Sequence, residues 1–371
     1  MKVLMLSRDD VFTVPGGDSI QMVGTKKELD KLEVQVQVGA DYRATNFRDF
    51  DILHVFNWEQ LGSVLSACES SNNRELPIVL STIFWFHTGH WYDDAVARKQ
   101  AWKIANTLLG SPRSRAVYEK WQQAKFRYGE RGQNFRRQLS ATAQILPNSL
   151  IEKLHLEVVL GLKGHLQRRC TIVPNGVDRE LYDPLPAPNE KFWKEYRLED
   201  FVLEVARIQS AKNQLGLLEA LSDTTFPIVF IGQPSPYEKD YVECCYDRAK
   251  QRGNVYFIEP KSSQELAGIY PLAAVHVLPS WRETPGLASL EAASAGCRIV
   301  TTSIGSTREY FGDEAWYCDP RDTSSIRKAV LAALESPPSE KLRSTVLDRF
   351  TWGAAAKKTL EAYHRVLDQT T

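Results

Sequence analysis

The chain has 371 residues, which exceeds one ordinary hydrophobic core and suffices for two domains. Lysine plus arginine and aspartate plus glutamate number 46 each, so the overall charge gives no support to nucleic-acid binding. Because no run of about 18 apolar residues occurs and the six cysteines lack metal-ligand spacing, membrane spans, structural zinc and disulfides are all disfavoured.

Short apolar runs in the N-terminal half indicate β/α units. They lie at residues 3–6, 52–56, 78–80, 145–146 and 172–173, with polar or amphipathic segments between them. The first run is too short for a secretory signal, so we expect a cytoplasmic protein. The glycines that follow, Gly16 and Gly17, do not complete a dinucleotide-binding GxGxxG pattern, and no Walker-type sequence occurs, which disfavours dehydrogenases and kinases.

The one Asp-x-Asp pattern, Asp49 and Asp51, precedes the apolar run 52–56. Its carboxylates are therefore expected at the amino end of a parallel strand, away from the edge where ligands bind. We interpret the pair as the start of a strand and expect no metal site.

Aromatic residues and two histidines follow the run 78–80. Phe84, Trp85, Phe86, Trp91 and Tyr92 suit either a wall on which an acceptor sugar stacks or ordinary core packing, and the sequence leaves both open.

A strongly basic segment spans residues 98–137. It contains eleven basic residues and only two acidic ones, with aromatic residues interleaved among them. This pattern fits a helix that docks on anionic lipid, a solvated helix pair, or an arm that binds an anionic acceptor, with nucleic acid less favoured.

The regular pattern stops in a Pro-, Asn-, Gly- and Asp-rich stretch near residues 174–195, where we place the domain boundary. Beyond it, apolar runs at 201–205, 228–231, 255–258, 274–278, 299–301 and 315–317 predict a parallel sheet covered by helices on both faces. The expected domains are 1–180 and 181–349. Ligands of such sheets lie at the carboxyl ends of the strands, which predicts a cleft between the two domains.

Two glutamates eight positions apart follow the run 274–278. At about 1.5 Å of helical rise per residue, Glu283 and Glu291 would lie roughly 12 Å apart, with Glu291 two turns inside a helix. The helix would begin at Gly286, Leu287 and Ala288, whose free backbone N–H groups favour a diphosphate.

Two cations, Arg207 and Lys212, follow the run 201–205 and could reach the same diphosphate. Pre-positioned cations stabilise a departing phosphate in place of a metal ion. Each of these residues could also be an ordinary solvated or helix-capping side chain.

Five segments in this order resemble glycosyltransferase family 4, a group of mostly retaining enzymes with the GT-B fold. They are 15–17, 51–55, 173–178, 205–212 and Glu283-x7-Glu291. The resemblance covers nearly the whole chain. It implies an α/β protein with two facing Rossmann-like domains, and a C-terminal helix of about 350–371 that packs back on the first domain.

The resemblance also implies roles for individual residues. Glu291 would bind the ribose, Glu283 the donor sugar, and Arg207 and Lys212 the diphosphate. The remaining donor-site residues would be Gly16, Gly17, Asn175, Gly232, Ile258, Pro260, Thr284, Pro285, Gly286, Leu287 and Ala288, with the base near Ile258 and Pro260.

One departure from the family pattern concerns a histidine that many members carry after the fourth strand. Ile83 occupies that position, and His87 or His90 is the candidate replacement. We include His87 among the expected catalytic residues.

The predicted function is metal-independent, retaining transfer of a sugar from a nucleoside-diphosphate donor to a glycan or lipid-linked acceptor in polysaccharide synthesis. UDP-glucose is the first candidate donor and GDP-mannose the second. No cofactor is expected. The alternatives are a non-hydrolysing nucleotide-sugar epimerase and a scaffold protein that has lost catalysis.

Overall fold

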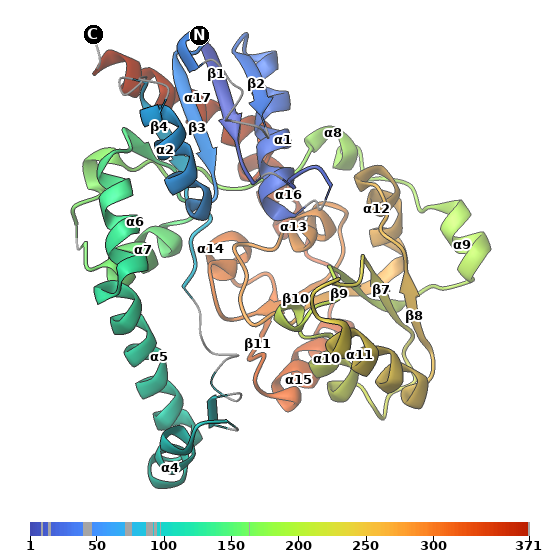
Figure 1. Ribbon diagram of the computed structural model, residues 1–371. Helices are drawn as coiled ribbons and strands as arrows, with labels where there is room; N and C mark the ends of the chain where they lie inside the picture. Colours follow the sequence, from blue (N-terminus) through green and yellow to red (C-terminus); the bar gives the residue numbers. More distant parts are fainter. Residues whose placement is uncertain are drawn as a thin grey trace. The chain divides into compact units, whose positions relative to one another are not determined.

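The computed structural model describes residues 1–8, 10–13, 16–39, 47–70, 76–86, 92, 95–96, 98–162 and 164–369. The chain forms two compact units, one of Met1–Pro174 with Trp352–Thr371 and one of Asn175–Thr351 (Figure 1). Along the chain, the division falls between residues 174 and 175, earlier than the predicted residue 180. Val177 pairs with Thr351, so this segment belongs to the second unit.

The N-terminal unit contains a parallel sheet of five strands in the order β2-β1-β3-β4-β5. The predicted strand at 172–173 is wrong, since these residues form no strand, and the nearest pairing is a single bridge between Ile145 and Cys170. The strands are β1 (Lys2–Leu6), β2 (Gln35–Gly39), β3 (Ile52–Phe56), β4 (Ile78–Ser81) and β5 (Gln144–Ile145).

The helices of this unit flank the sheet, except that α4 and α5 extend away from it as an arm (Figure 1). They are α1 (Gly17–Lys31), α2 (Leu61–Ser70), α4 (Gln100–Leu109), α5 (Ser111–Tyr128), α6 (Glu130–Ser140), α7 (Leu150–Leu160) and α17 (Trp352–Asp368).

Helix α17, the last of the chain, packs on α1 within the N-terminal unit. A Cβ on Gly24 would lie 2.6 Å from the Trp352 ring, so only a glycine lets the indole approach α1 this closely. The hydroxyl of Tyr363 lies 2.6 Å from Nδ1 of the buried His54 on β3. These contacts attach the C-terminal segment to the first unit, as the resemblance implied.

The acidic pair before β3 lies at the amino end of the sheet. The carboxylate of Asp51 accepts the backbone N–H of Lys2 at 2.7 Å, so it fastens the start of β1 to the start of β3. No three His, Cys, Asp or Glu side chains come together as metal ligands in the part of the chain that the structure describes.

The C-terminal unit contains a parallel sheet of six strands in the order β11-β10-β9-β6-β7-β8. Its side chains alternate between two buried clusters: Phe201 and Leu203 of β6 belong to one, and Val202 to the other. Burial on both faces explains why these strands are mostly apolar along their whole length. The strands are β6 (Phe201–Val205), β7 (Ile228–Ile231), β8 (Val255–Ile258), β9 (Ala273–Leu278), β10 (Ile299–Thr302) and β11 (Trp316–Cys318).

Helices precede, connect and follow these strands and cover both faces of the sheet. They are α8 (Arg179–Tyr182), α9 (Glu190–Tyr196), α10 (Gln214–Ala220), α11 (Lys239–Arg252), α12 (Ser263–Ile269), α13 (Leu287–Ser294), α14 (Thr307–Phe311), α15 (Thr323–Leu334) and α16 (Glu340–Arg349). None of the described helices, in either unit, is long and apolar enough to cross a membrane.

Candidate functional site

Glu283 lies in the loop between β9 and α13 and is only 7% exposed. Its backbone N–H donates to the Ile304 carbonyl at 3.1 Å, and its own carbonyl accepts the N–H of Ser306 at 3.0 Å. A Cβ on Gly305 would lie 2.0 Å from the Glu283 carbonyl oxygen, so this contact requires glycine. The loop after β10 thus holds Glu283 at the carboxyl edge of the sheet.

Lys212 forms an ion pair with Glu283. Its Nζ lies 2.6 Å from Oε1 of the carboxylate, across 71 positions of sequence. Lys212 ends a short 3₁₀ turn, Ser210–Lys212, which is tied to the Glu283 loop by the bond from the Trp281 N–H to the Ala211 carbonyl at 3.0 Å. The structure therefore brings together the predicted sugar-binding glutamate and one predicted phosphate-binding cation.

Arg207, the second predicted cation, lies on the same loop and is half-buried. Its carbonyl accepts a hydrogen bond from the side chain of Gln214 at 3.2 Å. The Gln214 side chain therefore holds the backbone at Arg207.

Helix α13 begins beside this pair. Gly286 precedes its first turn at φ +87°, and its Cβ would lie 3.0 Å from Leu278. The N–H groups of Leu287 and Ala288 have no acceptor within the helix, which makes this end suited to an anion. Just before it, the Thr284–Pro285 peptide bond is cis.

Glu291 lies in the second turn of α13, and not two turns inside it, because the helix begins only at Leu287. The predicted 12 Å separation from Glu283 assumed helical rise over all eight positions and so lacks its basis. Glu291 accepts a hydrogen bond from the Tyr270 hydroxyl at 3.0 Å. Burial raises the pKa of Glu291 to about 7, and the bond from Tyr270 opposes that rise.

Asn175 lies close to the same loop within the C-terminal unit. Its Nδ2 is 3.5 Å from the Thr284 carbonyl, and its backbone N–H donates to the Tyr310 hydroxyl at 3.1 Å. Its buried Oδ1 has no partner among the described residues.

Gly232 directly follows β7 and lies close to the backbone just after β6. A Cβ there would lie 2.0 Å from the Ala206 carbonyl oxygen. Ile258, by contrast, is 4% exposed within the hydrophobic core. Pro260 is exposed and is therefore the accessible member of the pair, and the position of the base near Ile258 and Pro260 stays a prediction.

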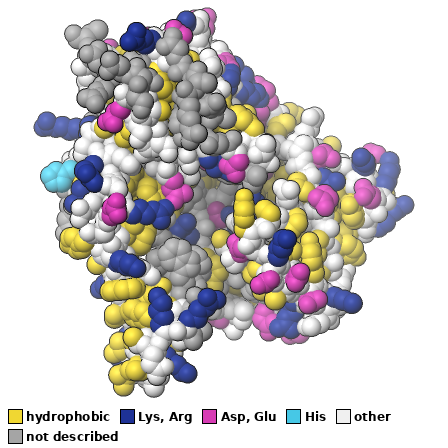
Figure 2. All heavy atoms as spheres, viewed as in Figure 1, with side chains coloured by type: hydrophobic (Ala, Val, Ile, Leu, Met, Phe, Trp, Pro, Cys, Tyr) yellow, Lys and Arg dark blue, Asp and Glu magenta, His cyan; other side chains and the backbone are white. Residues whose placement is uncertain are grey.

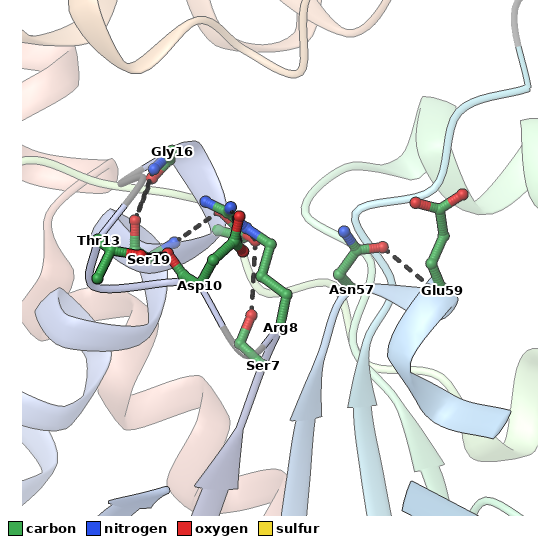
Figure 3. A network of polar contacts seen from close by, with 9 residues as sticks. Ser7, Arg8, Asp10, Thr13, Gly16, Ser19, Asn57 and Glu59 are labelled. Atoms are coloured by element: carbon green, nitrogen blue, oxygen red, sulfur yellow. Dashed lines mark hydrogen bonds and ion pairs between the residues drawn. The ribbon is translucent and has the colours of Figure 1, made fainter. Parts of the chain in front are cut away.

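In the N-terminal unit, Gly17 is the first residue of α1 and Gly16 is its N-cap. Figure 3 shows Gly16 beside Ser19. The Gly16 N–H donates to Ser19 Oγ at 2.7 Å, and a Cβ on Gly16 would lie 3.0 Å from the Asp18 carboxylate. Arg8 binds Asp18 at 2.8 Å and Asp10 at 2.7 Å. This polar cluster at the end of β1 was not predicted, although Arg8 and Asp10 directly follow a strand in the sequence.

His87 and His90 lie outside the described residues, as do Pro15 and Trp91. Ile83 adopts φ +43°, which is rare for a β-branched residue. The buried Glu152 holds this turn, because one of its oxygens accepts both the Thr82 hydroxyl at 2.5 Å and the Phe84 N–H at 2.6 Å.

Of the aromatic residues near this turn, Phe84 is completely buried and stacks on Phe135 at 5.5 Å between ring centroids. Tyr92 is buried against Tyr118. Of the two alternatives, a wall for an acceptor sugar or core packing, Phe84 and Tyr92 therefore follow core packing.

Residues 189–346 match the family model described as "Glycosyl transferases group 1". A curated relative is the D-inositol 3-phosphate glycosyltransferase of Stackebrandtia nassauensis, 29% identical over 230 residues, which are 56% of this chain and 51% of that protein. The chain thus spans about half the length of the curated relatives it matches.

Two solved structures share the fold over the full chain. Sucrose-phosphate synthase from Thermosynechococcus elongatus superposes with a TM-score of 0.72 at 16% identity, covering 100% of both chains. Anabaena HepE in complex with UDP and glucose gives 0.64 at 14% identity, covering 100% of this chain and 99% of that one. The predicted GT-B fold is confirmed. Over residues 189–346, the chain is similar to the glycosyl transferases of group 1.

Proposed function

We propose that this protein transfers a hexose from a nucleoside-diphosphate sugar to a glycan or lipid-linked acceptor in polysaccharide synthesis, with retention of configuration and without a metal ion. The observation that carries the proposal is the Lys212–Glu283 ion pair beside the start of α13, inside the segment that matches the family. UDP-glucose is the first candidate donor and GDP-mannose the second.

The charges around this pair suit a diphosphate leaving group. As the glycosidic bond breaks, negative charge gathers on the phosphate oxygens, and the Lys212 ammonium, the Arg207 guanidinium and the N-terminus of α13 stabilise it. In this proposal Lys212 leaves Glu283 for the phosphate. The Glu283 carboxylate is then free to accept hydrogen bonds from sugar hydroxyls.

The nucleoside would lie on the other side of the diphosphate, with its ribose hydroxyls donating to Glu291 and its base near the exposed Pro260. UDP is favoured because Anabaena HepE, which shares the fold, was solved with UDP and with UDP-glucose.

We assign the acceptor to the N-terminal unit, at the Arg8, Asp10 and Asp18 cluster beside Gly16. Carboxylates held by an arginine accept hydrogen bonds from sugar hydroxyls. The replacement of the family's histidine by His87 remains part of this proposal.

A thermal-shift panel of UDP, GDP, ADP and their sugars in EDTA tests the donor, because a ligand that binds only the folded state raises its stability. We expect a selective rise in Tm with UDP and UDP-glucose. A rise that needs Mg²⁺ would contradict the metal-free proposal. No rise with any nucleotide would favour the scaffold alternative, whereas conversion of donor without any acceptor would favour the epimerase.

Peripheral contact with an anionic membrane, at the inner face and from the cytoplasm, belongs to the same proposal. The arm of α4 and α5 exposes apolar side chains, among them Leu108 at 78%, Ile104, Val117, Trp121 and Tyr128. Exposed lysines and arginines lie among them, and Figure 2 shows both kinds side by side on the arm, at the lower left. An apolar surface bordered by cations is complementary to anionic lipid.

Vesicle flotation tests this contact. Wild-type protein should float with phosphatidylglycerol vesicles and not with phosphatidylcholine alone, and Leu108→Ser with Trp121→Ser should lower the bound fraction at least five-fold. The control is Tyr237→Ser, which removes an 81% exposed side chain from the other unit and should change nothing. Equal binding by all variants would contradict a role for the arm.

A further inference from the structure

Glu204 is a completely buried carboxyl group on β6 that the proposed reaction does not use. It lies on the sheet face that also carries Val202, Phe230 and Val275, all core residues. Its Oε1 accepts a hydrogen bond from Gln214 Nε2 at 2.8 Å, and its Oε2 has no partner among the residues described. An acid in this apolar surrounding costs several kcal/mol unless it is neutral and hydrogen-bonded.

Gln214, which is also fully buried, connects Glu204 to the loop that carries the two cations. Besides donating to Glu204, its Nε2 donates to the Arg207 carbonyl at 3.2 Å. Its Oε1 is 3.4 Å from the Gln209 N–H and 3.3 Å from the Tyr241 hydroxyl. The amide of Gln214 thus binds the loop backbone at Arg207 and at Gln209. Its hydrogen bonds with Glu204 and Tyr241 set its orientation.

The charge state of Glu204 fits this arrangement. Burial raises its pKa well above the ordinary value, the Lys212 ammonium opposes that rise, the Glu283 carboxylate adds to it, and the bond from Gln214 opposes it. From α11, Tyr241 and Cys245 face this group, and a charged Glu204 would raise the pKa of both. Burial therefore favours the neutral acid form of Glu204.

We infer that Glu204 is a positioning residue, which through Gln214 fixes the loop of Arg207 and Lys212 in the orientation that a departing diphosphate requires. The inference rests on the proposed function for its consequence in turnover. The loop geometry itself is a property of the free protein and is tested without substrate.

The test compares Glu204→Gln with Glu204→Leu in the full chain. Glutamine keeps an acceptor for Gln214 and matches the neutral acid in shape, whereas leucine removes the acceptor and leaves a buried N–H unpaired. The matched control is Val202→Ala, which opens the same face of the same strand two residues earlier without touching the loop.

The first measurement is hydrogen exchange of the amides of residues 206–214 without ligand. We expect exchange at least ten-fold faster in Glu204→Leu and within three-fold of wild type in Glu204→Gln and Val202→Ala. Equal exchange in Glu204→Leu and Val202→Ala would overturn the inference. If Glu204→Leu does not fold, Gln214→Met removes the same contacts from the loop side and should accelerate the same amides.

The second measurement is turnover with UDP-glucose, expressed per folded molecule. We expect kcat to fall at least ten-fold in Glu204→Leu while KM changes less than three-fold, with near-normal turnover in Glu204→Gln. Loss of kcat in Val202→Ala to the same extent would also overturn the inference. A wild-type protein that binds no nucleotide contradicts the proposed function alone, because the exchange measurement still decides the role of Glu204.

Discussion

The Lys212–Glu283 ion pair connects the proposed chemistry to stability, because Glu283 is almost fully buried. In Lys212→Ala, the carboxylate loses its partner, which should lower the free energy of unfolding by about 1–3 kcal/mol. The double variant Lys212→Ala, Glu283→Gln should regain most of that stability but no turnover. Calorimetry with a transfer assay distinguishes the two effects. Recovery of turnover in the double variant would show that the pair is only structural.

Replacement of Glu291 and of Glu283 should affect different properties, UDP affinity in the first case and kcat in the second. Glu291→Ala should weaken UDP binding at least ten-fold, since the ribose loses its acceptor, whereas Glu283→Ala should mainly lower kcat because it acts on the sugar. Isothermal titration with UDP, which lacks the sugar, measures the first effect alone. Equal loss of UDP affinity in both variants would refute this division of roles.

The pKa of Glu291, raised by burial to about 7, makes UDP affinity depend on pH. Because the carboxylate is the stronger acceptor, affinity should rise as the pH increases through about 7, and Glu291→Gln should bind weakly at every pH. Tyr270→Phe removes the bond that favours the charged form, so its midpoint should move upward. UDP titrations from pH 5.5 to 8.5 check this, and a flat profile in wild type would contradict it.

The same carboxyl group also affects folding. Its pKa is higher in the folded state than in the unfolded state, so its favourable contribution to stability is complete below about 4.5 and is lost as the pH rises through about 7. Glu291→Gln should therefore be more stable than wild type at pH 8, by up to about 3 kcal/mol. A melting curve that falls below wild type there would show that the carboxylate has a compensating partner.

At the scale of elements, the apolar runs of the C-terminal sheet could be predicted because its strands are buried on both faces. Strand β2 could not, since its sequence QVQVG alternates and its glutamines leave it without an apolar run. The contact of Glu283 with Lys212 could be predicted as a shared site, but not as an ion pair. The contacts of Gln214 could not be predicted either, because the sequence shows Glu204 only as a single polar residue inside an apolar strand.

The contact between α1 and α17 gives a prediction for a whole element. Gly24→Ala would gain helix propensity, about 1 kcal/mol, but its Cβ would overlap the Trp352 ring and displace α17. We expect a net loss of about 1–3 kcal/mol by calorimetry. Gly62→Ala in α2 is the matched control: its Cβ meets only the mobile end of Gln138, so stability should stay equal or rise. Equal effects would show that α17 does not depend on this contact.

At the scale of the whole molecule, each unit has its own core and its own buried neutral histidine. Burial lowers the pKa of His54 in the first unit and of His276 in the second to about 3. In the unfolded chain both would titrate near 6.5, so the unfolded state binds more protons below that pH. The stability that neutral histidines provide is therefore present above about 6.5 and is lost as the pH falls toward 3, in both units.

A substitution in one unit isolates this effect. His276→Asn keeps an amide near Ser289, which lies 3.5 Å from His276 Nδ1, but cannot take up a proton. Between pH 6.5 and 5 the variant should therefore lose about 2 kcal/mol less stability in the C-terminal unit than wild type does. Urea unfolding followed by hydrogen-exchange mass spectrometry reports the two units separately, and the N-terminal unit, which retains His54, is the internal control. A matching change in both units would mean that they unfold as one cooperative body, whereas no change in either would mean that carboxyl groups alone govern the acid response.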